Sequence, residues 1–477
     1  MMKKYKFEEI ADEIEEKITQ ELYKPGYKLP SVRELKAKYN TSISTIQRAY
    51  ECLLIKDMVR SEPKSGYYVK RKSNPISKIS SGFSHHVIIR DAYFENNLSK
   101  ISSMQISKNV LSEFNVAQPG DFFIPQKLIL RTMQQVIREK GASLLRYYPS
   151  NGSEKLREQI SERAASHQTH LNPSELIITD GALQALYIAL SCICMPGDVV
   201  AIESPCVFSV LEVLRIQKLK VIEIPVDIQD GFDIDHLKKA CSTTQIKAVL
   251  ITPNFHNPTG CLLSDEQKKS LLYLIQEKGI PLIENDIYGD LHYSGQRPAT
   301  IRSFDQSGLV LTYSSYSKSL ASGLRLGWLS AGQYFEKAEQ IKYTLGSTVS
   351  PVYQETILKL ISTTSYYRHC RQLRNQLARQ SFHTHNLLTE FFPKLTRFSF
   401  PSGGSNIWVK MDERTDMELF YKQCETIGVR FTPGYTFSYS NIYNHFFRIV
   451  FFDKYSVKRE DVIKLAGKAA SEQLAIW

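Results

Sequence analysis

The sequence predicts an α/β protein that is preceded by a small, mainly helical domain. Beyond about residue 111, short β-rich runs alternate with helical patterns, which is typical of a mostly parallel sheet covered by helices on both faces. Residues 1–72 show a different pattern of short helices followed by a hairpin, and the Ser-rich residues 73–110 separate the two parts. We therefore expect one domain over 1–72, a linker over 73–110 and a second domain over 111–477.

The first domain is predicted to be a helix-turn-helix with a β-hairpin wing. Apolar residues at helical spacing indicate an amphipathic helix over residues 6–22. Ser31 and Glu34 form the pattern of a capping box at the start of a second helix, and Ser42 can cap a third. A hairpin over residues 59–69 follows. The apolar positions of the first helix are Phe7, Ile10, Ile14, Ile18 and Leu22.

Charge and motif order favour DNA as the partner of this domain. The chain carries a net charge of +11, and residues 1–72 hold 16 Lys and Arg against 11 Asp and Glu, most of the acids lying in the first helix. In a helix-turn-helix, the first residues of the second helix meet base edges in the major groove. A small helical docking module is the alternative. The candidate DNA-binding residues are Ser42, Ser44, Thr45 and Arg48, with Lys64 at the tip of the wing.

The second domain is expected to contain at least six strands and, after about residue 390, a smaller α+β part. The helical patterns between the strands account for the covering layers. The expected strands are Leu176–Thr179, Val199–Glu203, Val221–Pro225, Ala248–Thr252, Pro281–Glu284 and Val310–Thr312.

The stretch from Ser315 to Lys318, followed by Arg325, has the residue types of a cofactor anchor. A lysine amine can bind an aldehyde covalently, while two hydroxyls and a guanidinium can hold a phosphate. An ordinary Ser-rich turn with a solvated lysine is the alternative. The free amides of Ala182 and Leu183, at a strand-to-helix junction, are also suited to a phosphate.

Two further positions could contact such a cofactor or its substrate. Asn257 follows a predicted strand, at the edge where open α/β sheets bind ligands, and could donate to a ring hydroxyl. Arg448 lies on an apolar strand and could bind a carboxylate through two N–H groups, or could form a structural salt bridge.

The first domain resembles the GntR-type winged helix-turn-helix over about residues 6–70. The resemblance implies DNA contacts by Arg33, Ser42, Thr45, Arg48 and Lys64. The family commonly has an arginine where this chain has Ile43, and this difference leaves the target sequence and the affinity open. The matching motifs are Lys24-Pro25-Gly26, Leu29 to Leu35, Thr45 to Tyr50, Leu53 and Ser65 to Val69.

Residues 112–470 resemble fold-type I pyridoxal-phosphate enzymes, the aspartate-aminotransferase superfamily. The resemblance implies that Lys318 binds the cofactor aldehyde, that Asn257 and Tyr288 contact the ring hydroxyl, and that Arg448 binds a substrate or effector carboxylate. It implies further that Tyr147 reaches the phosphate of a neighbouring subunit in a homodimer. The implied phosphate ligands are Ser315, Ser317, Arg325 and the amides of Ala182 and Leu183. The matching motifs are Pro119-Gly120, Pro125, Tyr147, Gly152, Pro196-Gly197-Asp198, Glu203-Ser204-Pro205, Asn257 to Gly260, Tyr288, Ser315 to Lys318, Arg325 and Gly403-Gly404.

Two positions depart from the pattern of this superfamily. Where the family has the carboxylate that faces the ring nitrogen, this chain has Asn285, and a neutral amide cannot keep that nitrogen protonated. Asp286 is adjacent, but successive strand residues point to opposite faces. Val207 replaces the aromatic residue that stacks on the ring, and Phe208 lies one residue further on. We expect the cofactor to bind and its carbanion chemistry to be weakened.

The whole chain resembles the MocR-type (GabR-like) regulators. This resemblance implies a homodimeric bacterial transcription factor that binds operator DNA and senses an amino compound, which would displace Lys318 from the aldehyde of pyridoxal 5'-phosphate. The alternatives are an active aminotransferase with a DNA-binding head and a cofactor-free scaffold. No membrane span or leader is recognisable, which favours the cytoplasm, and no metal site is expected from Cys192 and Cys194, which lie in an apolar run.

Overall fold

The computed structural model describes residues 5–20, 22–55, 58–62, 66–70, 86–93, 112–293 and 295–475. By their internal contacts they form two units, the first made of Met1–Ile79 with Tyr293–Gln296 and the second of Ser80–His292 with Arg297–Trp477. No helix within the described ranges is both long enough and apolar enough to cross a membrane.

The first unit is a helix-turn-helix followed by a two-stranded hairpin. The capping box forms as expected: the Glu34 amide donates to Ser31 Oγ at 3.2 Å, and the Ser31 amide donates to Glu34 Oε2 at 2.5 Å. One expectation was wrong, because the first helix ends at Thr19 and leaves Leu22 65% exposed. The elements are α1 (Lys6–Thr19), α2 (Val32–Tyr39), α3 (Ile43–Ile55), β1 (Val59–Glu62) and β2 (Gly66–Val69).

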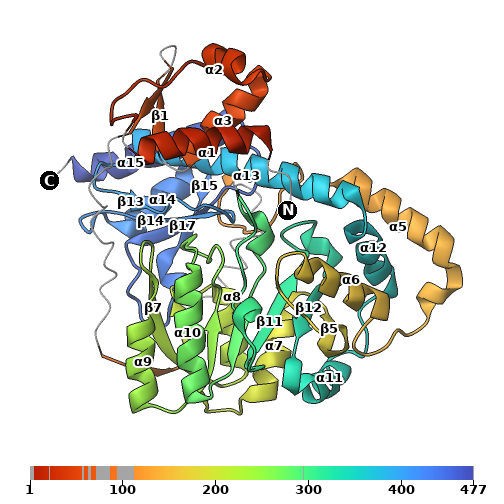
Figure 1. The fold of residues 1–477 in the computed structure, drawn as a ribbon. Helices are drawn as coiled ribbons and strands as arrows, with labels where there is room; N and C mark the ends of the chain where they lie inside the picture. Colours follow the sequence, from red (N-terminus) through yellow and green to blue (C-terminus); the bar gives the residue numbers. More distant parts are fainter. Residues whose placement is uncertain are drawn as a thin grey trace. The chain divides into compact units, whose positions relative to one another are not determined.

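A nine-stranded sheet forms the centre of the second unit (Figure 1). Its strand order is β3-β7-β6-β9-β10-β11-β12-β5, and β8 pairs with β7. The pairs from β7 to β11 are parallel, whereas β3, β12 and β5 join as antiparallel strands. The strands are β3 (Ile89–Asp91), β5 (Leu176–Thr179), β6 (Val199–Ser204), β7 (Lys220–Asp227), β8 (Gly231–Phe232), β9 (Ile246–Ile251), β10 (Leu282–Asn285), β11 (Val310–Ser315) and β12 (Gly327–Ser330).

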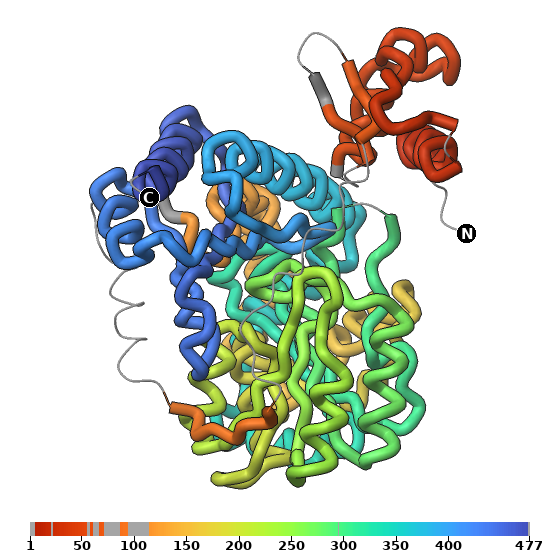
Figure 2. The backbone as a smooth tube through the Cα atoms, turned by 90° about the vertical axis from the view of Figure 1, so that its left-hand side faces the viewer, coloured from red at the N-terminus to blue at the C-terminus, as the bar shows by residue number. Residues whose placement is uncertain are grey.

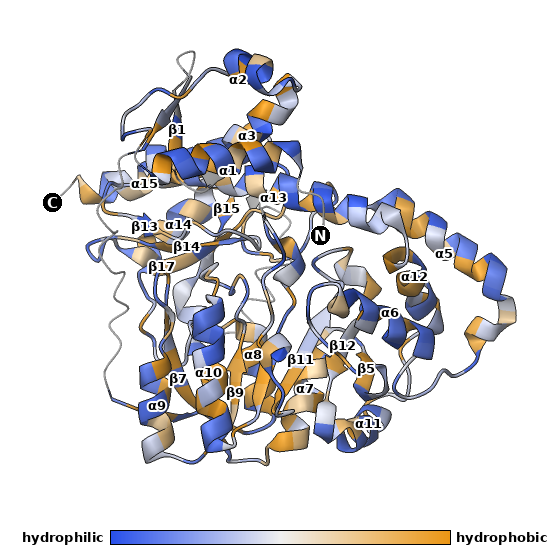
Figure 3. Ribbon diagram, viewed as in Figure 1, coloured by the Kyte–Doolittle hydropathy of each residue, from blue (hydrophilic) through white to orange (hydrophobic). Residues whose placement is uncertain are grey.

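Helices cover both faces of this sheet, whose strands are largely hydrophobic (Figure 3). Val200 and Ala201 are neighbours on β6 and pack into two different cores, one under α7, α8 and α11 and the other under α9 and α10. The expected mostly parallel sheet with helices on both faces is therefore confirmed. The helices are α5 (Gln126–Lys140), α6 (Glu154–Ala165), α7 (Ala182–Ile193), α8 (Phe208–Ile216), α9 (Ile234–Thr243), α10 (Asp265–Lys278), α11 (Phe335–Thr344) and α12 (Pro351–Ile361).

The C-terminal part, blue in Figure 2, lies at one end of the main sheet. The long helix α13 leads into an antiparallel sheet of order β13-β14-β17-β16, as expected for a small α+β part. Phe420 of α14 contacts Phe447 of β17, and α15 packs against α13 and α14. Its elements are α13 (Thr364–Phe391), β13 (Arg397–Phe398), β14 (Asn406–Lys410), α14 (Met417–Ile427), β15 (Val429–Arg430), β16 (Thr432–Pro433), β17 (Phe446–Val450) and α15 (Val457–Leu474), and β15 pairs with β4 (Ser112–Glu113).

Part of the expected linker belongs to the main sheet. Strand β3 pairs antiparallel with β7, in the register Ile89 with Ile222. Arg90 Nε lies 3.7 Å from Oε2 of the buried Glu223. Residues 86–93 are thus held on the sheet edge.

Candidate functional site

The candidate site lies at the edge where strands β11 and β5 end. Gly327 begins β12 between them and pairs with both Ser315 and Thr179. A Cβ at Gly327 would stand 2.7 Å from the carbonyl carbon of Gly181 and 2.8 Å from the oxygen of Ser314. Only glycine allows this close approach, which brings the start of α7 against the turn after β11.

Two hydroxyls, a guanidinium and a helix N-terminus meet at this point. Ser315 Oγ and Ser317 Oγ are 2.7 Å apart. Arg325 donates to the Asp180 carbonyl at 3.1 Å, and a Cβ added to Gly181 would stand 2.8 Å from its Nη2. The first amides of α7, from Ala182 and Leu183, have no acceptor within the helix. Such a donor set fits a phosphate.

Lys318 follows these hydroxyls and is largely buried. Its Nζ donates to the Ala117 carbonyl, and no carboxylate lies within ion-pair distance among the described residues. Burial, followed by the nearby cations Arg448 and Arg325, lowers the pKa of Lys318 to about 8. A larger fraction of this amine is therefore uncharged near neutral pH than for an exposed lysine, and the uncharged amine is the form that attacks an aldehyde.

Three buried side chains form a hydrogen-bonded row beside the lysine. Arg448 donates from Nη1 to Asn257 Oδ1 at 3.0 Å, and Asn257 donates from Nδ2 to the Tyr288 hydroxyl at 3.0 Å. The sequence therefore brings Asn257, Tyr288 and Arg448 together from three separate segments.

Arg448 is a buried cation held by neutral acceptors. It is 1% exposed and donates from Nη2 to the Asn115 carbonyl at 2.6 Å and to Thr432 Oγ1 at 3.1 Å. Within the described part of the chain it has no acidic partner, and burial lowers its pKa to about 10. A buried guanidinium without a counter-ion is suited to an incoming carboxylate. A backbone carbonyl and a lone threonine carry no sequence signal, so the sequence does not predict that Asn115 and Thr432 accept hydrogen bonds from Arg448.

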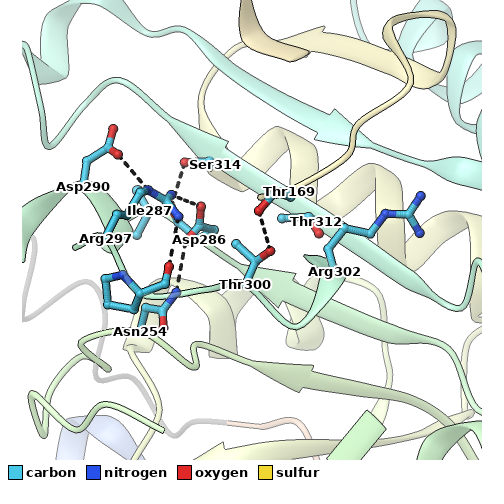
Figure 4. Close-up of polar contacts among 12 residues, drawn as sticks. Thr169, Asn254, Asp286, Ile287, Asp290, Arg297, Thr300, Arg302, Thr312 and Ser314 are labelled. Carbon is cyan, nitrogen blue, oxygen red and sulfur yellow. Dashed lines mark hydrogen bonds and ion pairs between the residues drawn. The ribbon is translucent and has the colours of Figure 1, made fainter. Parts of the chain in front are cut away.

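Asn285 and Asp286 make separate sets of contacts. Asn285 donates to Thr252 Oγ1 at 3.3 Å. Asp286 instead forms an ion pair with Arg297, which also donates to Asp290 at 2.9 Å (Figure 4). Burial raises the pKa of Asp286, and the Arg297 guanidinium opposes that rise. Asp286 is therefore committed to this ion-pair cluster.

Phe208 and Tyr147, the remaining cofactor candidates, make other contacts. Phe208 begins α8, with its ring edge-on to Phe437 at 6.1 Å between centroids, and Val207 packs against the hydrophobic core. Tyr147 is 86% exposed in the single chain. The structure does not bring Tyr147 and Phe208 into the row formed by Asn257, Tyr288 and Arg448.

In the first unit, the start of α3 is largely open to solvent. Ser42 and Ser44 are exposed, and Ser42 Oγ accepts from the Thr45 amide at 3.1 Å. Arg48 is half-buried, with its guanidinium 4.9 Å from the centre of the Phe7 ring, so it packs against α1.

Gln47, Arg33 and Lys64 are further polar or charged residues of this unit that bear on DNA binding. Gln47, which the sequence analysis did not single out, is exposed one helical turn after Ile43. Arg33 on α2 is exposed, and Lys64 lies outside the described residues.

Comparisons with known proteins match both units. Residues 114–459 match the aminotransferase class I and II family, and residues 6–69 match the bacterial regulatory proteins of the gntR family. The uncharacterized HTH-type transcriptional regulator YjiR of Escherichia coli (strain K12) is 32% identical over 97% of this chain and 98% of its own length. The HTH-type transcriptional regulator NorG of Staphylococcus aureus (strain USA300) is 27% identical over 86% of this chain and 92% of its own length.

Solved aminotransferases share the fold of the second unit. LysN, an α-aminoadipate aminotransferase from Thermus thermophilus, has a TM-score of 0.73 at 22% identity and covers 80% of this chain and 98% of its own. A multiple substrate aminotransferase from Thermococcus profundus has a TM-score of 0.75 at 21% identity. The match covers 81% of this chain and 97% of that enzyme. The chain belongs to the aminotransferase class I and II family, joined to a gntR-type helix-turn-helix in the arrangement of the MocR-type regulators.

Proposed function

We propose that this protein is a homodimeric transcriptional regulator that binds operator DNA through residues 1–72 and holds pyridoxal 5'-phosphate in its aminotransferase-like domain, residues 111–477. The observation that carries the proposal is the joining, in one chain, of a gntR-type domain to a site with a lysine and a phosphate-binding donor set. The relatives named above are transcriptional regulators over nearly the same length, which supports the same role here.

Different side chains of the site would bind different parts of the cofactor. When bound, pyridoxal phosphate supplies an aldehyde that reacts reversibly with amines. Ser315, Ser317, Arg325 and the start of α7 would hold the phosphate, and Lys318 would bind the aldehyde carbon. The Asn257 and Tyr288 pair would position the ring hydroxyl.

An amino acid is the class of effector that the site favours. Its amine would compete with Lys318 for the aldehyde, and its carboxylate would neutralise Arg448, whose buried charge has no acidic partner among the described residues. Because that neutralisation occurs only when the ligand is bound, it can favour one conformation over another, which is the requirement for a ligand to change DNA binding.

The exposed Tyr147 supports a dimer. A tyrosine that is 86% exposed next to Leu145, which is 89% exposed, makes an apolar surface that a second subunit would cover. In that dimer, Tyr147 would reach the phosphate of the partner.

A working aminotransferase with a DNA-binding head is the second candidate. The lowered pKa of Lys318 favours it, because the released amine could move a proton at the substrate carbon. Asn285 counts against it, since an amide supplies no charge to the ring nitrogen.

The experiment that separates the two uses full-length protein loaded with the cofactor. A duplex selected from a random library serves as the DNA, and a panel of amino acids is screened for changes in cofactor absorbance and in DNA affinity. We expect absorbance changes that alter DNA affinity without steady conversion of the cofactor to its amine form. Steady turnover would favour the enzyme instead. DNA binding that survives deletion of residues 1–72 would contradict the assignment of the first domain.

A further inference from the structure

The side chain of Asn285 is held in one orientation by two hydrogen bonds. The Ile287 amide donates to Asn285 Oδ1 at 3.2 Å, and Asn285 donates from Nδ2 to Thr252 Oγ1 at 3.3 Å. A backbone N–H can only donate, so this contact identifies Oδ1 as the oxygen and Nδ2 as the nitrogen of the amide. Within the described ranges the Asn285 side chain makes no other hydrogen bond, which leaves its second N–H available.

A second hydrogen-bonded row runs from Asn285 through Thr252 to the buried carboxyl group of Glu203. The Thr252 amide donates to Glu203 Oε2 at 2.9 Å, and Glu203, at the end of β6, is 5% exposed. His256 Nε2 lies 3.4 Å from the same oxygen. No lysine or arginine lies within ion-pair distance of Glu203 in the described part of the chain.

Burial disfavours charge on Glu203 and His256. It raises the pKa of Glu203 to about 8, although the bonds from Thr252 oppose the rise, and it lowers the pKa of His256 to about 3. The protonated form of the carboxyl group is therefore favoured near neutral pH, and the imidazole is neutral. Asp286, the acid that follows Asn285 in the chain, is occupied by Arg297.

A neutral amide beside a pyridine ring favours the unprotonated state of the ring nitrogen. The amide oxygen of Asn285 accepts from the Ile287 amide and keeps a second lone pair, but it carries no negative charge, whereas the second N–H of Asn285 complements the lone pair of an unprotonated ring nitrogen. A pyridine nitrogen that stays protonated at neutral pH needs an anion beside it, and the neutral amide of Asn285 supplies none.

We propose that Asn285 hydrogen-bonds an unprotonated pyridine nitrogen, and that Thr252 and Glu203 are positioning residues that keep its N–H directed to the ring. The inference rests on the proposed binding of pyridoxal phosphate. It assigns the site a cofactor that still exchanges amines at its aldehyde but withdraws electrons poorly.

The test reads the ring nitrogen directly. Full-length protein is loaded with pyridoxal phosphate that carries 15N in the ring, and the 15N chemical shift is measured by NMR after gel filtration. We expect a signal in the pyridine range for the natural protein and in the pyridinium range for Asn285→Asp. A pyridinium signal from the natural protein would overturn the inference. Loss of the cofactor during gel filtration would overturn the proposed function along with it.

Three further variants test the positioning residues. Glu203→Gln keeps the row neutral, so the signal should stay in the pyridine range. Thr252→Val removes the acceptor of Nδ2 and should move the signal downfield, toward pyridine without a hydrogen bond. Thr312→Val is the matched control, because Thr312 Oγ1 donates at 3.2 Å to Glu284, outside this row. An equal shift in Thr252→Val and Thr312→Val would show that Thr252 has no positioning role.

Discussion

Replacing Asp286 by asparagine should destabilise the second unit without changing the cofactor. Asp286 is 4% exposed at its side chain and pairs with Arg297, which is 10% exposed. Removing one partner of a buried ion pair costs about 3–5 kcal/mol. Arg297 keeps Asp290 at 2.9 Å, and Asp290 keeps Arg163 at 2.6 Å, so we expect a loss near the lower end, about 3 kcal/mol.

Tryptophan fluorescence is the natural assay, because all three tryptophans lie within residues 111–477. At roughly 2 °C per kcal/mol for a unit of this size, Asp286→Asn should lower the unfolding midpoint by about 6 °C. Arg297→Met should cost more, since it leaves Asp286 without a cation, and the double variant should cost about 2 kcal/mol less than the sum of the two. Glu418→Gln removes an exposed pair with Lys422 and should leave the midpoint unchanged.

The cofactor spectrum provides the second measurement on Asp286→Asn. Because Asp286 is committed to Arg297, the absorbance of bound pyridoxal phosphate should match that of the natural protein. A stability loss below about 1 kcal/mol would refute the account of the ion-pair cluster. A changed spectrum would refute the assignment of Asp286 away from the ring.

Three more predictions concern the lysine, the buried arginine and the DNA-binding surface. With a Lys318 pKa of about 8, the rate at which cofactor-free protein binds pyridoxal phosphate should rise roughly tenfold per pH unit below pH 8 and level off above it, because only the uncharged amine reacts. A pH–rate profile with its midpoint near pH 10 would contradict the lowered pKa of Lys318. Arg448→Met should abolish the absorbance response to amino acids while sparing that to amines without a carboxylate, and Arg397→Met on β13 is the control. Arg33→Ala should weaken DNA binding and reduce the salt slope of the affinity by about 1, whereas Arg48→Ala should leave the slope unchanged because its guanidinium covers Phe7.

Much of the fold could be predicted because its signals are local. Ser31 and Glu34 lie three residues apart, and their reciprocal bonds follow from that spacing alone. The β-rich run Leu176–Thr179 became β5 with the same bounds. By contrast, the short strand β3 lies within a Ser-rich stretch and is stabilised by its neighbour β7, a partner more than a hundred residues away.

In the candidate site, too, local motifs could be predicted and contacts between distant residues could not. Motif spacing singled out Lys318, Asn257 and Arg448, whose residue types suit the binding of an aldehyde, a ring hydroxyl and a carboxylate. It did not identify the partners that hold them, because the Asn115 carbonyl is a backbone group and Thr252 resembles any other threonine at a strand end. The spacing that made Arg48 a DNA-contact candidate did not predict that its guanidinium packs on the Phe7 ring of its own domain.

The docked strand β3 decides where the second unit can be cut from the chain. Without Ile89–Asp91, the first part of β7 would present unpaired amides and carbonyls along an open edge, the kind of edge at which separate molecules pair and aggregate. A truncated protein that starts at residue 111 would have that exposed edge and would lose the Arg90 contact with Glu223. One that starts at residue 86 would keep both, so residues 86–93 belong to the folding unit of the aminotransferase-like domain.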